Sequence, residues 1–468
     1  MTLFTHAGKA IAVITYSVLL AISSSSAIAK TLIDDTRLQA LKPPIVVIDP
    51  GKIIFLKPLK TVYVQKWGRD TGACGSKTSP CQSINHGLLR VAATTTPYDT
   101  ASLNSVYVGP GRYRENVVIN KTGIKVVSLF GTDMTIIAAS DSSDNTVSIT
   151  ADGVQFGAKD KGFTLMGSNL SGLFSTGSNV GVEGNRAVGN GRRGFELGDA
   201  TVNITQSNIT VKNNEAEFNG IGGFYFTDIS KAQVIGNVAR NNMRNGGGFM
   251  ATGSGFWFDS RCSDFTITRN RATENEAMGF FWRRFGITDH VINNNQAALN
   301  LSHGFMFMGD RISINDNTAV NNEGDGFHFM GYDHVQHFTY NTAVENTRAG
   351  IMFDIEVLPG ATVVDVISHN NIINNDSIRA SGNNCGLLNN FQDKGFDTVH
   401  DNFWGNPAVP GPGADPADDV CGFLTEDSAP AATMNTRYFI YPLPPVLITE
   451  PLATVFDFSE YMDAMITP

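Results

Sequence analysis

Beyond its first 30 residues, this sequence lacks any apolar run long enough to cross a bilayer, which excludes internal membrane-spanning helices. Basic residues are in the minority: 34 Lys and Arg against 44 Asp and Glu give a net charge of −10. An acidic surface argues against nucleic acid or an anionic membrane as the main partner. Cysteine is scarce, with 5 in the chain, and no Cys-x-x-Cys motif occurs, so a cysteine-based zinc site or a thioredoxin-like site has little support.

The start of the chain has the pattern of an export signal. His6 and Lys9 precede an apolar run from Ile11 to Ile22, and Ala27-Ile28-Ala29 has the small residues of a signal-peptidase site. We therefore expect residues 1–29 to be a signal peptide and the mature protein to be secreted, either extracellular or periplasmic. A retained membrane anchor is the alternative, which the shortness of the apolar run disfavours.

The cysteines suggest a pairing for an oxidising compartment. Cys74 and Cys81 flank a short loop, and Cys385 and Cys421 lie near the C-terminal end of the regular part of the chain. We expect these two pairs to form disulfides and Cys262 to remain a free, buried thiol.

One phrase repeats through the middle of the chain: Asn, a second Asn five positions later, then Gly followed by Phe or Ile. The leading asparagines lie 22 to 33 residues apart, and this period with a fixed internal register is typical of a solenoid. The leading residues are Asn185, Asn214, Asn237, Asn270, Asn295, Asn317, Asn341 and Asn370, and their partners are Asn190, Asn219, Asn242, Asn275, Asn300, Asn322, Asn346 and Asn375.

Large apolar residues alternate after each glycine, as in Phe280/Trp282 and Phe305/Phe307, which predicts half-buried strands with these pairs facing inward. We expect the preceding glycines, such as Gly279, to provide positive φ at a tight turn. Stacked parallel rungs place Asn on Asn, so we expect the side-chain amides to form a buried hydrogen-bonded ladder. Asn300, although it begins the sequon Asn300-Leu301-Ser302, is therefore a poor glycosylation site.

Residues 61–405 resemble the right-handed parallel β-helix proteins of the pectate-lyase-like superfamily. The resemblance rests on Cys81-Gln82-Ser83-Ile84, on Val106-Tyr107-Val108-Gly109-Pro110-Gly111 with Tyr113 and Glu115, and on the closing phrase Asp401-Asn402-Phe403-Trp404-Gly405. It implies an all-β solenoid with an N-terminal capping helix, expected around 82–93 with Ile84, Leu88, Leu89 and Ala92 on one face. Residues 30–60 are then a linker and 406–468 a Pro-rich tail. The superfamily includes lyases, hydrolases, epimerases, adhesins and copper-maturation proteins, so the resemblance specifies the fold more than the activity.

Residues between the inward pairs face outward in two columns. The first is Glu196, Tyr225, Trp257, Phe281, Met306, His328 and Met352, and the second is Gly198, Thr227, Asp259, Arg283, Met308, Met330 and Asp354. Apolar surface of this kind indicates a binding site, a covered face or a protein interface. Aromatic rings suit sugar rings, so the candidate substrate-binding residues are Tyr225, Trp257, Asp259, Phe281, Met306 and Asp354. A long loop or the tail folding over this face is the main alternative.

The number of rungs between charged residues of the second column and His328 distinguishes glycoside hydrolysis from β-elimination. Asp259 and Asp354 are four rungs apart, roughly 19 Å, which is too far for a pair of glycosidase carboxylates. Asp259 and Arg283 are neighbours, so we expect an ion pair. Arg283 and His328 lie roughly 10 Å apart, a separation that suits β-elimination on a uronate, with Arg283 neutralising the carboxylate and His328 removing the α-proton.

The known catalytic motifs of the superfamily are absent. Ser302-His303-Gly304 resembles only the histidine element of polygalacturonases, without its aspartate motifs. His334 and His337 are weaker catalytic candidates, expected in loops near the same face. A soft copper cluster of Met306, Met308, His328, Met330 and Met352 is a further hypothesis.

The sequence thus predicts an exported β-helix protein that binds an extracellular polysaccharide or cell-surface glycan. Whether it is an enzyme is left open; if it is, a polysaccharide lyase or another carbohydrate-active enzyme is expected. A non-catalytic adhesion protein and a periplasmic copper-handling protein are the alternatives. The resemblance leaves calcium open as a cofactor. It also keeps copper under consideration, but methionines on a covered or sugar-binding face are the simpler explanation, so copper is disfavoured.

Overall fold

The structure is a computed structural model. It describes residues 46–49, 52–55, 60–92, 103–201, 205–245, 252–283, 289–308, 310–330, 334–354, 364–373, 375, 386–389, 396–400, 402 and 420–422. The expected signal peptide, most of the tail and Cys385 lie outside these residues, so the Cys385–Cys421 pairing stays a prediction. Within the segment expected to be a linker, β1 (Val46–Asp49) and β2 (Lys52–Phe55) form an antiparallel pair.

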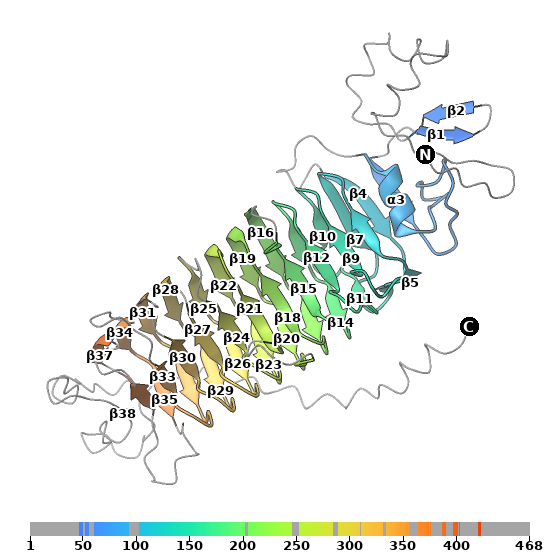
Figure 1. The fold of residues 1–468 in the computed structure, drawn as a ribbon. Coiled ribbons are helices and arrows are strands. Elements are labelled where there is room, and N and C mark those ends of the chain that lie inside the picture. The colour runs from blue at the N-terminus through green and yellow to red at the C-terminus, as the bar shows by residue number, and fades with distance from the viewer. Residues whose placement is uncertain are drawn as a thin grey trace, which may run out of the picture.

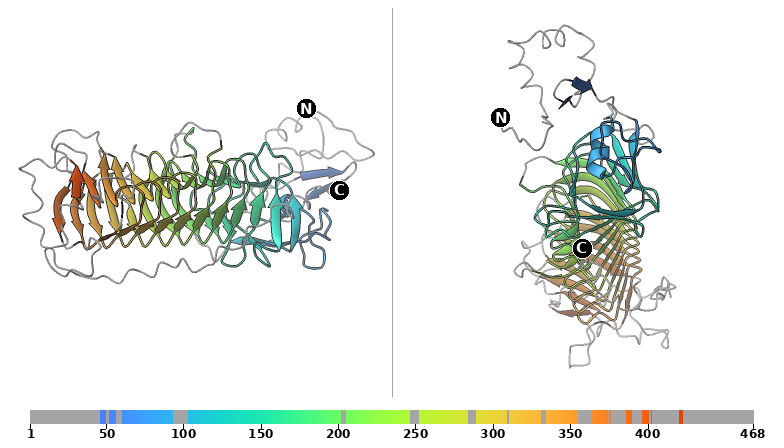
Figure 2. Two further views of the ribbon diagram at one scale, coloured as in Figure 1. Left: turned by 90° about the horizontal axis from the view of Figure 1, so that it is seen from below. Right: turned by 90° about the vertical axis from the view of Figure 1, so that its right-hand side faces the viewer.

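The described chain winds through three parallel sheets in turn, so that each strand pairs with the equivalent strand of the next coil (Figure 1). We call one such coil a rung; Figure 2 shows the rungs stacked along one axis. The first sheet, of 13 described strands, contains β3 (Thr61–Val64), β4 (Asn104–Val108), β7 (Ile124–Ser128), β10 (Gln155–Gly157), β13 (Gly181–Glu183), β16 (Gln206–Lys212), β19 (Ile229–Ile235), β22 (Ser263–Thr268), β25 (Val291–Asn293), β28 (Asp310–Asn315), β31 (His334–Thr339), β34 (Val364–Ser368) and β37 (Phe396–His400).

The other two sheets complete each rung. The second sheet, of 11 described strands, contains β5 (Gly111–Arg114), β8 (Thr135–Ala138), β11 (Thr164–Met166), β14 (Arg186–Val188), β17 (Glu215–Glu217), β20 (Val238–Arg240), β23 (Arg271–Thr273), β26 (Gln296–Ala298), β29 (Thr318–Val320), β32 (Thr342–Val344) and β35 (Asn371–Ile373). The third sheet, of 12 described strands, contains β6 (Val117–Ile119), β9 (Val147–Ile149), β12 (Leu173–Ser175), β15 (Arg193–Leu197), β18 (Gly222–Phe226), β21 (Ser254–Phe258), β24 (Phe280–Trp282), β27 (Phe305–Phe307), β30 (Phe327–Met330), β33 (Ile351–Asp354), β36 (Leu387–Asn389) and β38 (Val420–Gly422).

The asparagines form the two predicted ladders at the corners between the sheets. In one rung, the Nδ2 of Asn275 donates to the Oδ1 of Asn300 at 2.9 Å and to the carbonyl of Ala239 at 3.1 Å. The backbone N–H of Asn275 also donates to the Oδ1 of Asn300, at 3.1 Å. The first ladder continues to Asn402, from the closing phrase, which accepts from Asn370. These amides are almost fully buried, so the ladder satisfies corners that water does not reach.

Positive φ occurs at a different place from the one expected. Within the described residues, the position before each ladder asparagine has a left-handed conformation, as at Glu274 (φ 56°) and Leu299 (φ 57°). The glycines before the inward phenylalanines do not, so that expectation was wrong. Their role is steric: a Cβ at Gly279 would lie 2.7 Å from the Ala297 Cβ and 3.0 Å from the Asn300 Nδ2.

The inward aromatic residues stack along the axis, as the alternation predicts. The rings of Phe195, Phe224, Phe256, Phe280, Phe305 and Phe327 have successive centroid separations of 4.7–4.9 Å. A second stack runs from Phe226 through Phe258, Trp282, Phe307 and Phe329 to Phe353 at 4.7–5.1 Å. Both stacks are buried in the interior and hold the rungs in register.

The helix α3 (Ile84–Arg90) lies at the N-terminal end of the stack, against β3, β4 and β6. Ser83 caps its first turn, and the Glu115 carboxylate accepts from two further backbone N–H groups, which suits an anion at a helix N-terminus. Ile84 and Leu88 are buried, but Leu89 is 52% exposed, so its expected place on the packed face was wrong.

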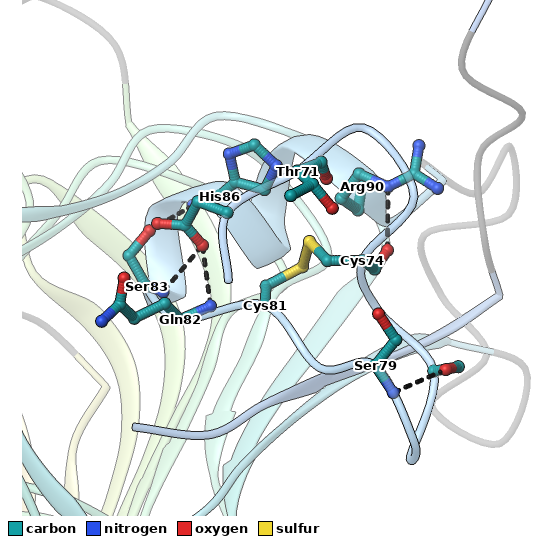
Figure 3. The surroundings of a disulfide bond; sticks show 10 residues. Thr71, Cys74, Ser79, Cys81, Gln82, Ser83, His86 and Arg90 are labelled. Carbon is teal, nitrogen blue, oxygen red and sulfur yellow. Dashed lines mark hydrogen bonds between the residues drawn. A yellow bond between two sulfur atoms is a disulfide. The ribbon is translucent and has the colours of Figure 1, made fainter. Parts of the chain in front are cut away.

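The disulfide between Cys74 and Cys81 is present, as predicted (Figure 3). Both cysteines are fully buried, and Arg90 donates from Nε to the carbonyl of Cys74 at 3.1 Å, which fixes the loop against α3. Cys262 is a free, buried thiol, also as predicted. Burial raises the pKa of this thiol well above its usual value, so it is inert in the folded protein.

Candidate functional site

The first outward column of the third sheet, which we call the outer face, is covered. Its residues from Glu196 to Met352 are exposed by only 0–9%, with Phe281 at 0% and Trp257 at 8%. Ala277 and Met278 pack on Tyr225, Trp257, Phe281 and Met306, and Met308 and Met330 pack at the border. These rings are therefore covered, but among the described residues the cover comes from Ala277 and Met278 and not from a long loop or the tail.

A further column borders the outer face, two residues before the first inward residue of each strand. Its members are Arg193, Gly222, Ser254, Met278, His303, Asp325 and Ala349. Strand pairing aligns Arg193 with Gly222 and Gly222 with Ser254, and the Ser254 hydroxyl lies 3.7 Å from the Met278 sulfur. Sequence reasoning missed this column because its members have the parity of the inward residues. They lie where the chain enters the strand, so their side chains reach the outer face instead.

A buried ionic group lies at the N-terminal end of the outer face. The Nη1 of Arg193 is 2.5 Å from the Oε1 of Glu196, and the Ser171 hydroxyl donates to the other carboxylate oxygen. The Arg193 guanidinium lies 3.6 Å from the centre of the Tyr225 ring, a cation–π contact. Burial lowers the pKa of Arg193, while the Glu196 carboxylate acts in the opposite direction.

Tyr225 connects this group to the second outward column. Its hydroxyl donates to Asp259 Oδ2 at 2.8 Å, and Arg283 Nη1 lies 3.5 Å from the same oxygen, which confirms the expected Asp259–Arg283 ion pair. Burial and the Asp259 carboxylate raise the pKa of Tyr225 well above its usual value. The Arg283 side chain is 39% exposed and so remains accessible to an anionic ligand.

At the other end, His303, Asp325 and His328 converge. Asp325 Oδ2 lies 2.7 Å from His328 Nδ1 and 3.0 Å from His303 Nδ1, while the backbone N–H of Ala349 donates to Oδ1 at 3.0 Å. Burial alone would raise the pKa of Asp325, but the two imidazoles hold it well below its usual value. Burial lowers the pKa of His303. Asp325 was not anticipated, although Asp325/His328 repeats the i, i+3 spacing of Arg193/Glu196.

Strand pairing gives the separation between Arg283 and His328, the two residues predicted to be catalytic. Arg283 follows β24, and His328 lies in β30, two rungs further along the third sheet. At the usual strand spacing this separation is roughly 10 Å. Asp259 and Asp354 are four rungs apart in the same register, so they are not a glycosidase pair.

The remaining candidates are only partly placed. Met306 and Met352 pair on either side of His328, and Met308 and Met330 are half-buried. The side chains of Asp354 and His334 lie outside the described residues. His337 is exposed in β31 of the first sheet, so the expectation that it lies in a loop beside the outer face was wrong.

Two groups of side chains in the described part of the chain have the spacing of metal ligands. One is Cys74, Cys81 and His86, whose cysteines are committed to the disulfide. The other is His303, Asp325 and His328. Neither group offers the oxygen-rich ligand set that calcium prefers. No helix among the described residues has the length and apolarity needed to cross a membrane.

Comparison with known proteins identifies the fold. Residues 105–261 match the family described as "Right handed beta helix region". The matched segment is about a third of the chain, and the same parallel β-helix continues through the three sheets of the described residues. This right-handed β-helix has no match among curated proteins.

Solved structures with a similar chain path include three kinds of protein. The A-module of mannuronan C-5 epimerase AlgE4 from Azotobacter vinelandii is 17% identical, with a TM-score of 0.47 over 69% of this chain and 91% of that one. The periplasmic alginate epimerase AlgG is 11% identical, with a TM-score of 0.35 over 66% and 73%. The catalytic domain of a GH87 α-1,3-glucanase is 16% identical, with a TM-score of 0.45 over 82% and 70%. At these identities the likeness concerns the fold alone.

Proposed function

We propose that this β-helix binds an acidic polysaccharide along the border of the outer face and cleaves it by β-elimination. The observation that carries the proposal is the 2.7 Å pairing of His328 Nδ1 with the Asp325 carboxylate, on the same sheet face as Arg283. A histidine oriented by a carboxylate is a base with a fixed tautomer, and an arginine two rungs away supplies the cation that an acidic sugar requires.

Each residue has a distinct role in the elimination. The Nε2 of His328 is buried beneath the outer face, so this reaction requires the side chains that cover it to move when the glycan binds. With a proton on Nδ1 donated to Asp325, that Nε2 then carries the lone pair that accepts the proton α to the uronate carboxylate. Arg283 binds that carboxylate and stabilises the negative charge that develops as the proton leaves. The electron pair forms a carbon–carbon double bond, the glycosidic C–O bond breaks, and the leaving oxygen takes a proton from water.

Charge and exposure point to an anionic ligand at this border. Although the whole chain carries a net charge of −10, the cations bordering the outer face are accessible: Arg283 is 39% exposed and Arg192 is 43% exposed. The rings of Trp257 and Phe281 are buried beneath, so they support the binding surface rather than stack on sugars. Contact with the glycan is therefore mainly ionic and should weaken as salt rises.

Binding and cleavage are tested separately on a panel of uronate-containing polysaccharides. Binding is measured by retardation in glycan-containing native gels and cleavage by the ultraviolet absorbance of unsaturated uronates. Arg283→Ala should weaken binding about 10-fold or more, as expected for a lost charged hydrogen bond. Its control, Arg311→Ala, removes an exposed arginine of the first sheet that pairs with Asp289 and should change nothing.

The role of His328 as the base is tested by substituting it, with a substitution of the exposed His337 as the control. His328→Gln should retain binding and lose cleavage by about 100-fold or more, whereas His337→Ala, at an exposed position in β31, should behave like the wild type. Binding without any cleavage would favour the adhesion alternative. If no acidic glycan binds, or if Arg283→Ala binds as well as the wild type, the proposal is wrong.

A further inference from the structure

We propose that His303, Asp325 and His328 form a binding site for one divalent transition-metal ion of the zinc type. This site is separate from glycan binding, and it shares Asp325 and His328 with the proposed cleavage reaction, so this inference is tested without glycan.

The geometry of three ligands from two adjacent rungs carries the proposal. His303 stands just before β27, Asp325 just before β30, and His328 within β30. Their ligating atoms all lie within 4.8 Å of one another, and the two ring centroids are 4.4 Å apart. Stacked rungs fix the backbone of all three residues, so the site is largely formed before a metal binds.

The donor set selects the class of metal. Two imidazoles and one carboxylate suit zinc and neighbouring divalent ions, whereas calcium and magnesium prefer oxygen-only sites. Zinc–ligand bonds of about 2.0–2.1 Å set ligand–ligand separations of roughly 3.3 Å in a tetrahedron. The observed 2.7 and 3.0 Å contacts to Asp325 Oδ2 therefore need to open by only about half an ångström.

The hydrogen bonds around His303 Nδ1 show what a bound cation would have to replace. The backbone N–H of Asp325 donates to His303 Nδ1 at 3.0 Å, which requires a lone pair on that nitrogen. The Asp325 Oδ2 lies 3.0 Å from the same nitrogen, so two electron-rich atoms face one another. That nitrogen has one lone pair, so a metal bound there would replace the hydrogen bond from the Asp325 backbone and separate the two electron-rich atoms by a cation.

The charge balance at the site agrees with a bound cation. Asp325 is 3% exposed, and its ion pairs among the described residues are with the two histidines alone. A buried carboxylate needs a counter-charge, and Arg348, which acts on His303 electrostatically, is the other cation near the site. A divalent ion supplies that charge, and three protein ligands leave a coordination position open, as in catalytic zinc sites.

Metal binding and the proposed elimination should exclude one another. A metal held by the Asp325 carboxylate and His328 Nδ1 replaces the hydrogen bond that orients His328 as a base. If the cleavage reaction exists, zinc should therefore inhibit it. The binding test below uses no glycan, so it can succeed or fail independently of the proposed function.

The test is titration of the full chain, first stripped with a chelator, with Co²⁺ as a coloured probe. We expect one ion per chain, visible absorption bands of a four- or five-coordinate site, and loss of those bands when zinc is added. His303→Gln and Asp325→Asn should each weaken binding by about 100-fold or more, whereas His337→Ala and Asp289→Ala, outside the site, should not.

X-ray absorption on the zinc-loaded wild type provides a second measurement, which does not depend on how the variants fold. It should show two imidazole ligands and light-atom ligands at zinc–nitrogen distances. Absence of stoichiometric uptake would overturn the proposal. So would uptake that is equal in wild type and folded His303→Gln, or a spectrum without imidazole scattering.

Discussion

The side-chain amide of Asn300 donates to the Oδ1 of Asn322 in the next rung at 2.9 Å, and the backbone N–H of Asn300 donates to the same oxygen at 3.1 Å. Asn300 in turn accepts the equivalent two hydrogen bonds from Asn275. Each ladder asparagine therefore satisfies both a backbone group and a side chain of the previous rung, at a corner that is closed to water.

Asn300→Ala should destabilise the protein by about 2–4 kcal/mol, because it leaves buried donors of Asn275 without an acceptor. The side chain of Asn300 is 0% exposed, so water cannot replace the lost amide. Denaturant unfolding measures the loss. Asn293→Ala, at a half-exposed position of the same rung, is the control and should cost less than about 0.5 kcal/mol. Equal effects of the two substitutions would contradict a structural role for the ladder.

The same burial predicts glycosylation by position. Among the Asn-x-Ser/Thr sequons of the chain, Asn169 and Asn208 are two that are exposed, whereas Asn300 is fully buried. In folded protein secreted from a eukaryotic host, Asn300 should be unmodified and the two exposed sites should be available for modification. Peptide mass spectrometry reads the occupancy. Modified Asn300 in protein with wild-type unfolding behaviour would disprove burial of that corner.

Sequence reasoning predicted what repeats from rung to rung. The spacing from Asn275 to Asn300 and the alternation in Phe280/Trp282 recur with fixed register, so the ladder, the inward stacks and the outward parity could all be predicted. The role of Gly279 could not be, because positive φ and lack of space both favour glycine, and only the neighbouring Ala297 and Asn300 decide between them.

The candidate site was harder to predict because it departs from the repeat. His303 and Asp325 have inward parity, and only the turn of the chain before the strand brings them beside His328. Trp257 and Phe281 are covered by residues such as Met278, which lies before the strand and not in the outward columns. In Arg193/Glu196 and Asp325/His328, the first residue lies two positions before the inward Phe and the second lies one position after it. This shared i, i+3 spacing is the sequence pattern that could have predicted the site.

The buried pair Arg193–Glu196 gives a prediction for the outer face. Arg193→Ala should cost about 3–5 kcal/mol, because it leaves the buried Glu196 carboxylate without its main counter-charge. Arg192 pairs with the same carboxylate at 3.4 Å but is 43% exposed, so Arg192→Ala should cost less than about 1 kcal/mol. Unfolding midpoints in denaturant compare the two. A larger loss from Arg192→Ala would mean that the exposed arginine holds Glu196.

The carboxylates of β17 predict how stability depends on pH. Glu215 and Glu217 lie between Arg186 and Arg240 of the adjacent rungs. Burial, a hydrogen bond with Glu217 and its charge raise the pKa of Glu215 to about 7, while the two arginines act in the opposite direction. The pKa of Glu217 is lowered: burial opposes this, but hydrogen bonds with Glu215 and Arg186 outweigh it.

A raised pKa in the folded state means that the folded protein binds the proton more tightly than the unfolded chain. The contribution of Glu215 is therefore fully present below the unfolded pKa, about 4.3, and is lost as pH rises through about 7. The contribution of Glu217 has the opposite sign and is lost only at lower pH. Glu215→Gln should thus flatten the fall in melting temperature between about pH 4.5 and 7, whereas Glu323→Gln, at an exposed position, should leave the curve unchanged. Parallel curves for wild type and Glu215→Gln would show that Glu215 titrates normally and that the arginines offset its burial.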